Sequence, residues 1–192
     1  TELYKRPFEL GDSGHPILPF LIQSLKGVSL EGAVLAITSK IVSLSEGATV
    51  SGSMDKRTLV KREADQYLGE GGYGIELTIK HGLLIPSAGI DESNSEVGDY
   101  ILFPKDPFAS AKLIWQGLRS HFGLQNLGVI LTDSHTTPLR MGVTGIALSY
   151  WGFRGVSSKV DEPDLYGRKL KFTHIDVVDA LAVSAVLVMG EA

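Results

Sequence analysis

The residue types that bind cations and phosphates are gathered in three short polar segments, each next to an apolar stretch. In one of them, Asp133 directly follows the apolar run Gly128–Thr132. Carboxylate oxygens suit a hard cation such as Mg²⁺, so Asp133 is a candidate metal ligand, with capping of a turn as an equally open structural alternative. Arg140 follows in the same segment. Its planar guanidinium can bind a phosphate or a carboxylate, although a lone arginine more often forms a surface salt bridge.

A second polar segment, Ile90–Asn94 (IDESN), places Asp91 and a further acid in a loop after the sequence SAG. Such a loop suits a metal ion or a metal–phosphate complex. Polar loops are common, however, and the pattern is weak by itself. Asp91 and Asp133 form one metal–nucleotide site only if the fold brings these two distant residues together.

The remaining segment, Thr38–Gly47 (TSKIVSLSEG), supplies a lysine, several hydroxyls and an acid after an apolar run. Lys40 can neutralise phosphate oxygens, Glu46 can add a ligand to a metal ion, and Ser43 lies between them. A solvated strand and loop without a ligand is the alternative interpretation.

Other motifs of nucleotide binding and catalysis do not fit this sequence. GEGGYG at residues 69–74 matches G-x-G-x-x-G, but it follows a helix-like segment and no helix opens after it, so we interpret it as a flexible hairpin or lid. No P-loop, G-x-S-x-G or H-E-x-x-H motif is present. The histidines show no metal-ligand spacing, and only His81 and His135 lie near the acidic segments.

Composition excludes several classes of protein. The 192 residues include 22 acids and 18 bases, and this net charge of −4 argues against nucleic acid as a partner. The lack of cysteine excludes disulfides, thiolate metal sites and a cysteine nucleophile. The longest strongly apolar stretch, Ala180–Met189, is far shorter than the roughly 20 residues of a membrane span, and no signal peptide opens the chain. We therefore expect a cytoplasmic protein with no membrane partner.

Hydrophobic spacing predicts the elements that must position these residues. Helices are expected at Ile17–Lys26, Thr58–Leu68 and Ser110–Phe122. Strands are expected at Ala33–Thr38, Ile75–Ile79, Gly82–Ser87, Gly128–Thr132 and Gly142–Tyr150. Strands and helices do not alternate regularly, which favours an α+β fold of mixed sheets with flanking helices.

A final helix is expected over His174–Met189, capped by Thr173, with Asp176 and Asp179 sharing a face of its first turns. Acids at this end favour the helix dipole, which is a sufficient structural reason for them. The rest of the helix is apolar almost all round, so it must be buried in the core or against a second subunit. This pattern predicts a homodimer.

Several segments, in order from about Leu35 to the end of the chain, resemble the coenzyme F420-0:L-glutamate ligase (F420:gamma-glutamyl ligase) family. They read TSKIVSLSEG, HGLLIPSAGIDESN, FPKDPFASA, GVILTDSHTTPLRMG, PDLYGRKL and the terminal VMGEA. The resemblance implies an α+β fold in an intertwined dimer, with active sites near the dimer interface. It also implies GTP (or ATP) as co-substrate and Mg²⁺ or Mn²⁺ as cofactor in attaching L-glutamate to a carboxylate through an amide, by way of an acyl phosphate.

The resemblance can be carried over to individual residues. The family's metal-binding acids match Asp91 and Asp133, its hydroxyl after the second acid matches Ser134, and its SK and EG pair matches Lys40 and Glu46. The candidate metal ligands are thus Asp91, Asp133 and Glu46. The candidate nucleotide-binding residues are Lys40, Ser43 and Ser134, and the candidate catalytic residues are Lys40 and Arg140.

The sequence departs from the family pattern in places. Leu44 replaces a second lysine, and Thr136 and Thr137 stand at the positions of a Gly-Arg pair. Family members also continue past the last helix, so we expect a single domain over residues 1–192 without that C-terminal segment. The predicted function is a gamma-glutamyl ligase whose acceptor is F420-0 or a related, folate-like carboxylate. The alternatives are another amino-acid ligase that uses the acyl-phosphate route, or a non-catalytic binding homologue that keeps the fold.

Overall fold

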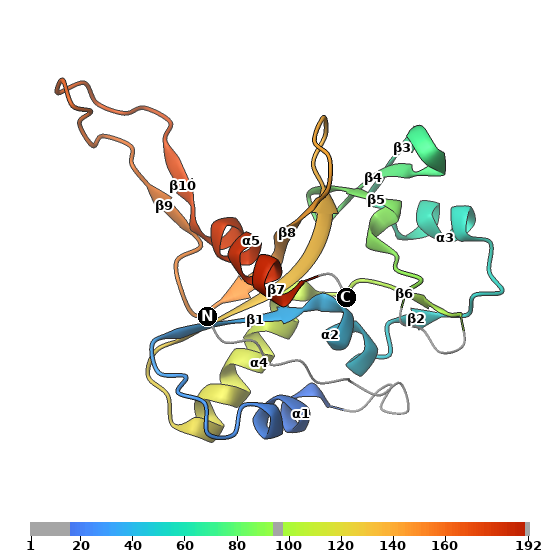
Figure 1. Ribbon diagram of the computed structural model, residues 1–192, viewed down its shortest axis with the longest axis horizontal. Helices are drawn as coiled ribbons and strands as arrows, with labels where there is room; N and C mark the ends of the chain where they lie inside the picture. Colours follow the sequence, from blue (N-terminus) through green and yellow to red (C-terminus); the bar gives the residue numbers. More distant parts are fainter. Residues whose placement is uncertain (1–15, 94–97, 191–192) are drawn as a thin grey trace.

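The computed structural model describes residues 16–93 and 98–190. At its centre lies a three-stranded sheet in the order β1-β7-β8 (Figure 1). β1 (Ala33–Thr38) runs parallel to β7 (Leu127–Thr136), and β8 (Val143–Trp151) pairs with β7 as an antiparallel hairpin. The bounds of β1 are those predicted from its apolar run. The mixed sheet and its flanking helices confirm the predicted α+β class.

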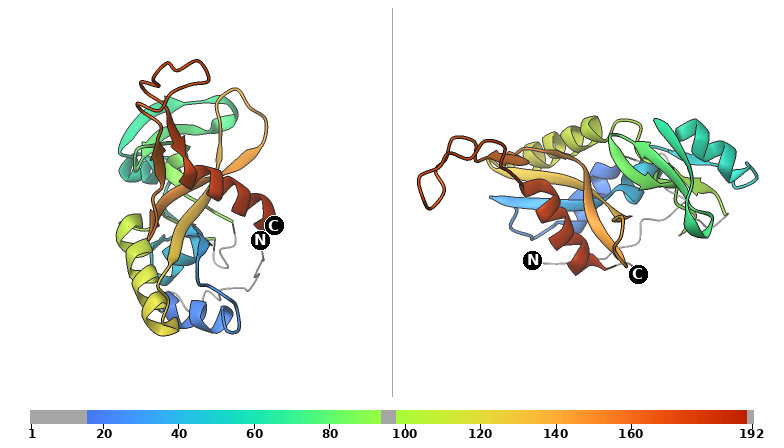
Figure 2. Two further views of the ribbon diagram at one scale, coloured as in Figure 1. Left: turned by 90° about the vertical axis from the view of Figure 1, so that its left-hand side faces the viewer. Right: turned by 90° about the horizontal axis from the view of Figure 1, so that it is seen from above.

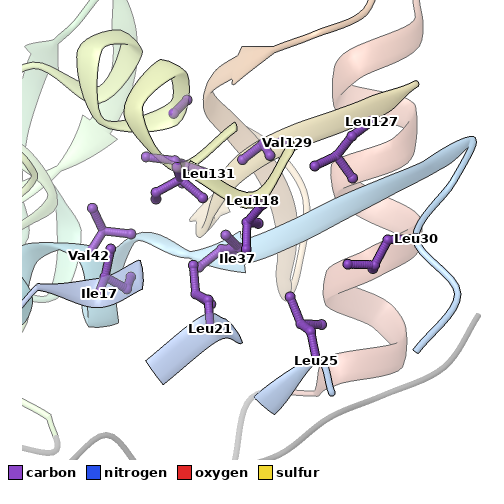
Figure 3. Close-up of a cluster of buried hydrophobic side chains, with 12 residues drawn as sticks. Ile17, Leu21, Leu25, Leu30, Ile37, Val42, Leu118, Leu127, Val129 and Leu131 are labelled. Atoms are coloured by element: carbon purple, nitrogen blue, oxygen red, sulfur yellow. The ribbon is translucent and has the colours of Figure 1, made fainter. Parts of the chain in front are cut away.

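One face of this sheet is covered by the helices α1 (Ile17–Ser24), α2 (Ser39–Ser45) and α4 (Pro107–Phe122). Alternate residues of β7 point to this face because side chains alternate along a strand. Leu127, Val129 and Leu131 therefore pack against residues of the three helices, as Figure 3 shows. Among the helix and strand residues that share this core are Ile17, Leu21, Leu118, Ile37 and Val42.

The opposite face of the sheet is covered by α5 (Val177–Met189). Val178 and Ala182 of this helix pack on Ile130, which alternates with the core-facing residues of β7. The helix approaches β8 closely where Gly145 has no side chain, since a Cβ there would lie 2.6 Å from the Ala182 carbonyl oxygen. α5 thus covers one face of the sheet and is not surrounded by strands (Figure 2).

A second group of elements lies beside the central sheet. The antiparallel sheet β3-β4-β5 packs with α3 (Lys56–Glu63), and a short two-stranded sheet links it to the centre. The strands are β3 (Gln66–Glu70), β4 (Glu76–Lys80), β5 (Leu83–Pro86), β2 (Thr49–Val50) and β6 (Tyr100–Ile101). A 3₁₀ turn, η2 (Gly72–Gly74), joins β3 to β4, so the glycine-rich sequence forms a hairpin as expected.

Two hairpins project from the body of the molecule (Figures 1 and 2). One is the turn between β7 and β8. The other is a long arm whose base pairs β9 (Val156–Ser158) with β10 (His174–Asp176). Large apolar side chains near the tips of both hairpins are exposed, including Leu139, Met141 and Leu165.

Three features of the structure differ from the sequence-based interpretations. The last helix begins at Val177 and not at His174, because His174–Asp176 pairs with β9 and the Asp176 carboxylate caps the helix by accepting from Asp179 N–H. The predicted helix Thr58–Leu68 ends at Glu63, and the chain turns there into β3. The segment after β1 is the helix α2, which contradicts the alternative interpretation of that segment as a solvated strand and loop.

Candidate functional site

The site is built at one edge of the central sheet. β1 ends at Thr38, which pairs with Thr132 of the parallel strand β7, and β7 continues beyond this point to Thr136, so that Asp133 lies within the strand. α2 begins immediately after Thr38, and Asp133 follows Thr132 in the neighbouring strand. This arrangement brings the first turn of α2 next to Asp133, which lies on the same face of β7 as Leu131.

Asp91 reaches this edge from the neighbouring sheet. It forms an antiparallel bridge with Ile101, with backbone hydrogen bonds of 2.9 and 2.8 Å in the two directions. Just before it, Ser87, Ala88 and Gly89 have φ of 50°, 55° and 71°, so three successive residues adopt the left-handed conformation. Non-glycine residues rarely do so, and such turns are kept only where the surrounding structure enforces them.

The helix α2 separates two cavities. Ser39, Lys40 and Ser43 line a small pocket together with Asp91 and Asp133. We call this the acidic pocket; Gly89, Ile101, Leu102 and Phe103 complete its lining. The opposite side of α2, with Val42, Ser45 and Glu46, lines a much larger cavity. The division follows helical periodicity, because residues three and four apart share a face.

In the acidic pocket, Lys40 and Asp91 form an ion pair with 2.5 Å between Nζ and Oδ2. The Lys40 ammonium also donates to the Ser93 hydroxyl at 2.9 Å, and Ser93 N–H donates to Asp91 Oδ1 at 2.6 Å. Burial pushes the pKa of the Asp91 carboxyl upward, but the hydrogen bonds from Lys40 and Ser93 outweigh it and hold the pKa below its usual value. Asp91 is therefore a carboxylate at neutral pH.

The Ser43 hydroxyl is the clearest sign that this pocket takes a polar ligand. Ser43 is 1% exposed, and its Oγ has no hydrogen-bond partner among residues 16–93 and 98–190. A buried polar atom without a partner is costly, so such an atom calls for a ligand or a water molecule. The pocket has a volume of about 10 Å³, which is about the space that one water molecule or one metal ion fills. Two carboxylates and a hydroxyl are the oxygen donors that Mg²⁺ or Mn²⁺ prefers.

The structure brings Lys40, Ser43, Asp91 and Asp133 together and leaves three other candidates outside the pocket. Glu46, the residue that follows α2, lies on the side of the larger cavity and accepts from the Ser110 hydroxyl at 2.5 Å. Ser134 lies next to Asp133 but alternates to the face that α5 covers. Arg140 is exposed in the turn between β7 and β8.

The remaining sequence candidates are also accounted for. His81 lines the larger cavity, and His135 contacts the Thr144 carbonyl through Nδ1 at 3.3 Å. Asn94 of the IDESN segment lies outside the described residues. In the described part of the chain, no three histidine or acidic side chains are grouped closely enough to hold a metal ion by themselves. A metal ion in the acidic pocket would thus depend on two acids and neutral oxygens.

The larger cavity has a volume of about 800 Å³ and a mostly apolar wall. Its wall includes α1, α2 and the first turns of α4, and its polar residues include Glu46, His81, Lys105 and Asp106. We call it the apolar cavity. Cavities of this size accept small organic molecules.

Two residues at the site were not singled out by the sequence. Ser93 lies within the IDESN segment, whose polarity was noticed, but its contact with Lys40 links residues 53 positions apart. Thr78 is buried in β4, where it holds the backbone of the left-handed turn. A threonine in an apolar strand gives no local signal of this role, so only the fold reveals it.

Within the described residues, no helix is both long and apolar enough to cross a membrane. Comparison with known proteins identifies a family that matches this chain and several relatives. The family model described as F420-0:Gamma-glutamyl ligase matches residues 53–192. A coenzyme F420:L-glutamate ligase of Methanopyrus kandleri is 36% identical over 180 residues, which cover 84% of this chain and 71% of the relative.

Two further ligases of the same name match the chain at similar identity. The coenzyme F420:L-glutamate ligase of Methanothermobacter thermautotrophicus is 33% identical over 181 residues, covering 85% of this chain and 71% of the relative. The one from Methanocaldococcus jannaschii is 36% identical over 167 residues, covering 85% and 66%. These matches confirm the resemblance seen in the spaced motifs and its assignment to a family of ligases. The chain belongs to the F420-0:gamma-glutamyl ligase family.

Proposed function

We propose that this chain joins L-glutamate to the carboxylate of F420-0, or of a related acceptor, at the expense of GTP or ATP. The observation that carries the proposal is the acidic pocket, where Lys40, Asp91 and Asp133 meet a buried Ser43 hydroxyl that has no hydrogen-bond partner in the described part of the chain. Its residues come from the segments that match the family's metal and nucleotide motifs. A ligase of this kind needs a cation to hold a nucleotide, and the pocket contains both acids for a metal and a lysine for phosphate.

Asp91, Asp133 and Ser43 would hold a Mg²⁺ or Mn²⁺ ion. A divalent ion supplies positive charge that neutralises phosphate oxygens and polarises the phosphoryl group. Lys40, at the start of α2, is placed to bind a phosphate of the same nucleotide. The acids, the hydroxyl and the lysine thus have complementary roles in one small volume.

The acceptor in this scheme lies in the apolar cavity, on the other side of α2. The acidic pocket is too small for an organic acceptor, whereas about 800 Å³ accommodates one. The acceptor carboxylate takes the γ-phosphoryl group and the nucleoside diphosphate leaves. The glutamate amine then attacks the acyl phosphate, which forms the amide and releases phosphate and a proton. Lys105 and His81 at the cavity wall are placed to orient an anionic acceptor.

Metal binding is the first test. Asp133→Asn keeps the size of the side chain and removes its charge, so Mn²⁺ affinity measured by calorimetry should fall at least tenfold. Asp161→Asn is the matched control, because Asp161 is an exposed acid in the β9–β10 arm. Unchanged affinity in Asp133→Asn would remove Asp133 from the proposed ligand set.

Activity is tested by incubating the chain with F420-0, L-glutamate and GTP or ATP, with and without Mg²⁺ or Mn²⁺. We expect metal-dependent release of phosphate together with an acceptor that is heavier by one glutamate, detected by mass spectrometry. Metal and nucleotide binding without any product from F420-0 or a folate-like acceptor would favour the non-catalytic homologue. Nucleotide binding should also weaken in Lys40→Ala. Nucleotide binding that is equally strong with and without metal would contradict the proposed role of the metal ion in holding the nucleotide.

We further propose that the chain acts as a homodimer. α5 packs one side on the sheet, while Leu187 is 82% exposed and Val183 and Val188 are also exposed. Near the arm's tip and base, Leu165 and Phe172 are 99% and 86% exposed. Apolar surface spread over projecting hairpins and a helix is typical of a surface that a second subunit covers. Sedimentation at micromolar concentration should give twice the 20.7 kDa mass of one chain. A stable species with the mass of a single chain would contradict the dimer.

A further inference from the structure

One acid of the expected metal site, Asp91, is already paired with a cation, the ammonium of Lys40. Its Nζ lies 2.5 Å from Asp91 Oδ2 and 2.9 Å from the Ser93 hydroxyl oxygen. These partners, a carboxylate and a neutral oxygen, are the same classes of donor that a divalent ion would take. Lys40 and Asp91 are both partly buried, with side chains 25% and 35% exposed. Water screens this pair less than it screens an ion pair on the open surface.

Both oxygens of Asp91 are in use. Oδ2 is paired with Lys40, and Oδ1 accepts from the backbone N–H of Ser93 at 2.6 Å. The Ser93 N–H belongs to the loop backbone and cannot be withdrawn without moving the loop. Lys40 instead holds Asp91 through a flexible side chain of four methylenes. Among the contacts of Asp91, the one most readily given up to an incoming ion is that with the Lys40 ammonium.

We propose that Lys40 is a tethered counter-ion that blocks the acidic pocket against divalent metal until a phosphate group draws it away. This inference rests on the proposed function of the pocket and adds to it an order of events. Metal alone must displace the ammonium from Asp91 and also bind beside its positive charge, so binding is weak. A nucleotide offers the ammonium a new anionic partner, which frees Asp91 and removes the competing cation. Lys40 thereby couples metal binding to the presence of phosphate.

The proposal predicts an effect opposite to that of losing an ordinary site residue. Lys40→Met keeps most of the side-chain stem and removes the charge. Manganese binding to the metal-stripped protein, measured by calorimetry without nucleotide, should become about tenfold tighter. Ser93→Ala leaves the net charge unchanged and removes a hydroxyl that binds both the Lys40 ammonium and Asp91. It should tighten Mn²⁺ binding about two- to threefold, and circular dichroism checks the fold of each variant.

Lys56→Met is the matched control, because Lys56 pairs with Glu92, the neighbour of Asp91, and its loss changes the net charge equally. Its Mn²⁺ affinity should stay within about twofold of the original. The proposal is overturned if Lys40→Met binds Mn²⁺ no more tightly than the original chain. It is also overturned if Lys56→Met tightens binding as much, because the loss of any nearby positive charge then accounts for the effect. Ser93→Ala carries the same test should Lys40→Met lose its fold.

Asp91→Asn separates this proposal from the proposed function. If Asp91→Asn weakens Mn²⁺ binding while Lys40→Met and Ser93→Ala leave it unchanged, the metal site stands and the blocking role of Lys40 falls. If Asp91→Asn, Lys40→Met and the unaltered protein all bind Mn²⁺ equally, Asp91 holds no metal and both proposals fall.

Discussion

The Thr78 hydroxyl, in the middle of β4, joins β5 to Ala88 in the turn that precedes Asp91. It accepts from the backbone N–H of Ala88 at 2.8 Å and donates to the carbonyl of Ile85 at 2.5 Å. Thr78 and Ala88 are both buried, so water does not replace these bonds. Because Ser87, Ala88 and Gly89 hold left-handed conformations, the hydroxyl is one of the contacts that keep this turn in its unfavourable shape.

Thr78→Val is therefore expected to lower the free energy of unfolding by about 1–3 kcal/mol, because it leaves the buried N–H of Ala88 without an acceptor. Mn²⁺ affinity should fall as well, since Asp91 lies three residues after Ala88. Urea unfolding and calorimetry measure the two effects. Thr78→Ser keeps the hydroxyl and should lose less stability and no metal affinity. A loss in Thr78→Val no larger than that in Thr78→Ser would contradict the role assigned to the Thr78 hydroxyl.

A second prediction concerns Asp179, which holds the bulged part of β8 to α5. Its Oδ1 accepts from Ala147 N–H at 2.8 Å, next to the irregular register between β7 and β8. Burial raises the pKa of the Asp179 carboxyl above its usual 3.8, with Asp176 acting in the same direction and the Ala147 N–H opposing it. Folding thus favours protonated Asp179. The stability from this group is complete below pH 3.8 and is lost as the pH rises through the raised pKa.

Asp179→Asn keeps an oxygen for Ala147 N–H and carries no charge to desolvate. The difference in melting temperature in favour of Asp179→Asn over the original chain should be largest at pH 7 and should disappear below pH 3.8. Asp179→Ala leaves the Ala147 N–H without its acceptor and should lose about 1–3 kcal/mol relative to Asp179→Asn at every pH. A melting-temperature difference between Asp179→Asn and the original chain that stays constant with pH would contradict the assigned pKa shift.

The candidate site could be predicted in part, because its residues come from segments with local signals. The apolar run of β1 located the strand with both ends, and the polar residues after it contained Lys40 and Ser43. Glu46 was grouped with them because its carboxylate could bind a metal ion and because it matches the EG motif of the family. In the structure Glu46 follows a helix and lies four residues after Val42, so the two share a side and both line the apolar cavity.

The parts that could not be predicted depend on contacts between distant residues. The start of the last helix is fixed by pairing of His174–Asp176 with Val156–Ser158, which no local periodicity reveals. The pair of Lys40 and Asp91 likewise depends on the bridge between Asp91 and Ile101. Sequence showed which residues had suitable chemistry, and the strand pairing decided which of them meet.

A third prediction concerns His81, in the two-residue turn between β4 and β5. His81 and Gly82 have φ of 51° and 77°, and Lys80 pairs with Leu83 across them. Burial and the nearby Lys80 charge lower the pKa of His81 below its usual 6.5, against the opposing effect of Asp65 and Asp106. Folding thus favours neutral His81. The stability from this group is complete above pH 6.5 and is lost as the pH falls through the lowered pKa.

His81→Asn removes the titrating ring and creates an Asn-Gly pair, which suits a turn with two left-handed residues. Its melting temperature should fall less than that of the original chain when the pH is lowered from 7.5 to 5. His121→Gln, at an exposed position near the end of α4, is the control and should follow the original chain. Identical pH dependence in His81→Asn and the original chain would show that His81 does not titrate differently in the folded state.

The last prediction tests how closely α5 lies on the central sheet. An added Cβ at Gly145 would lie 2.6 Å from the Ala182 carbonyl oxygen and 2.8 Å from Val186 Cβ. Neither is the flexible end of a side chain, so Gly145→Ala must move α5 away from β8. We expect a loss of about 1–3 kcal/mol in urea unfolding. Because the outer side of α5 belongs to the proposed dimer surface, sedimentation should also show weaker self-association.

Gly72→Ala is the control, since nothing lies within 4 Å of a Cβ at that position and its φ is not positive. Equal losses in both variants would mean that a general cost of replacing glycine, and not the contact with α5, accounts for the change.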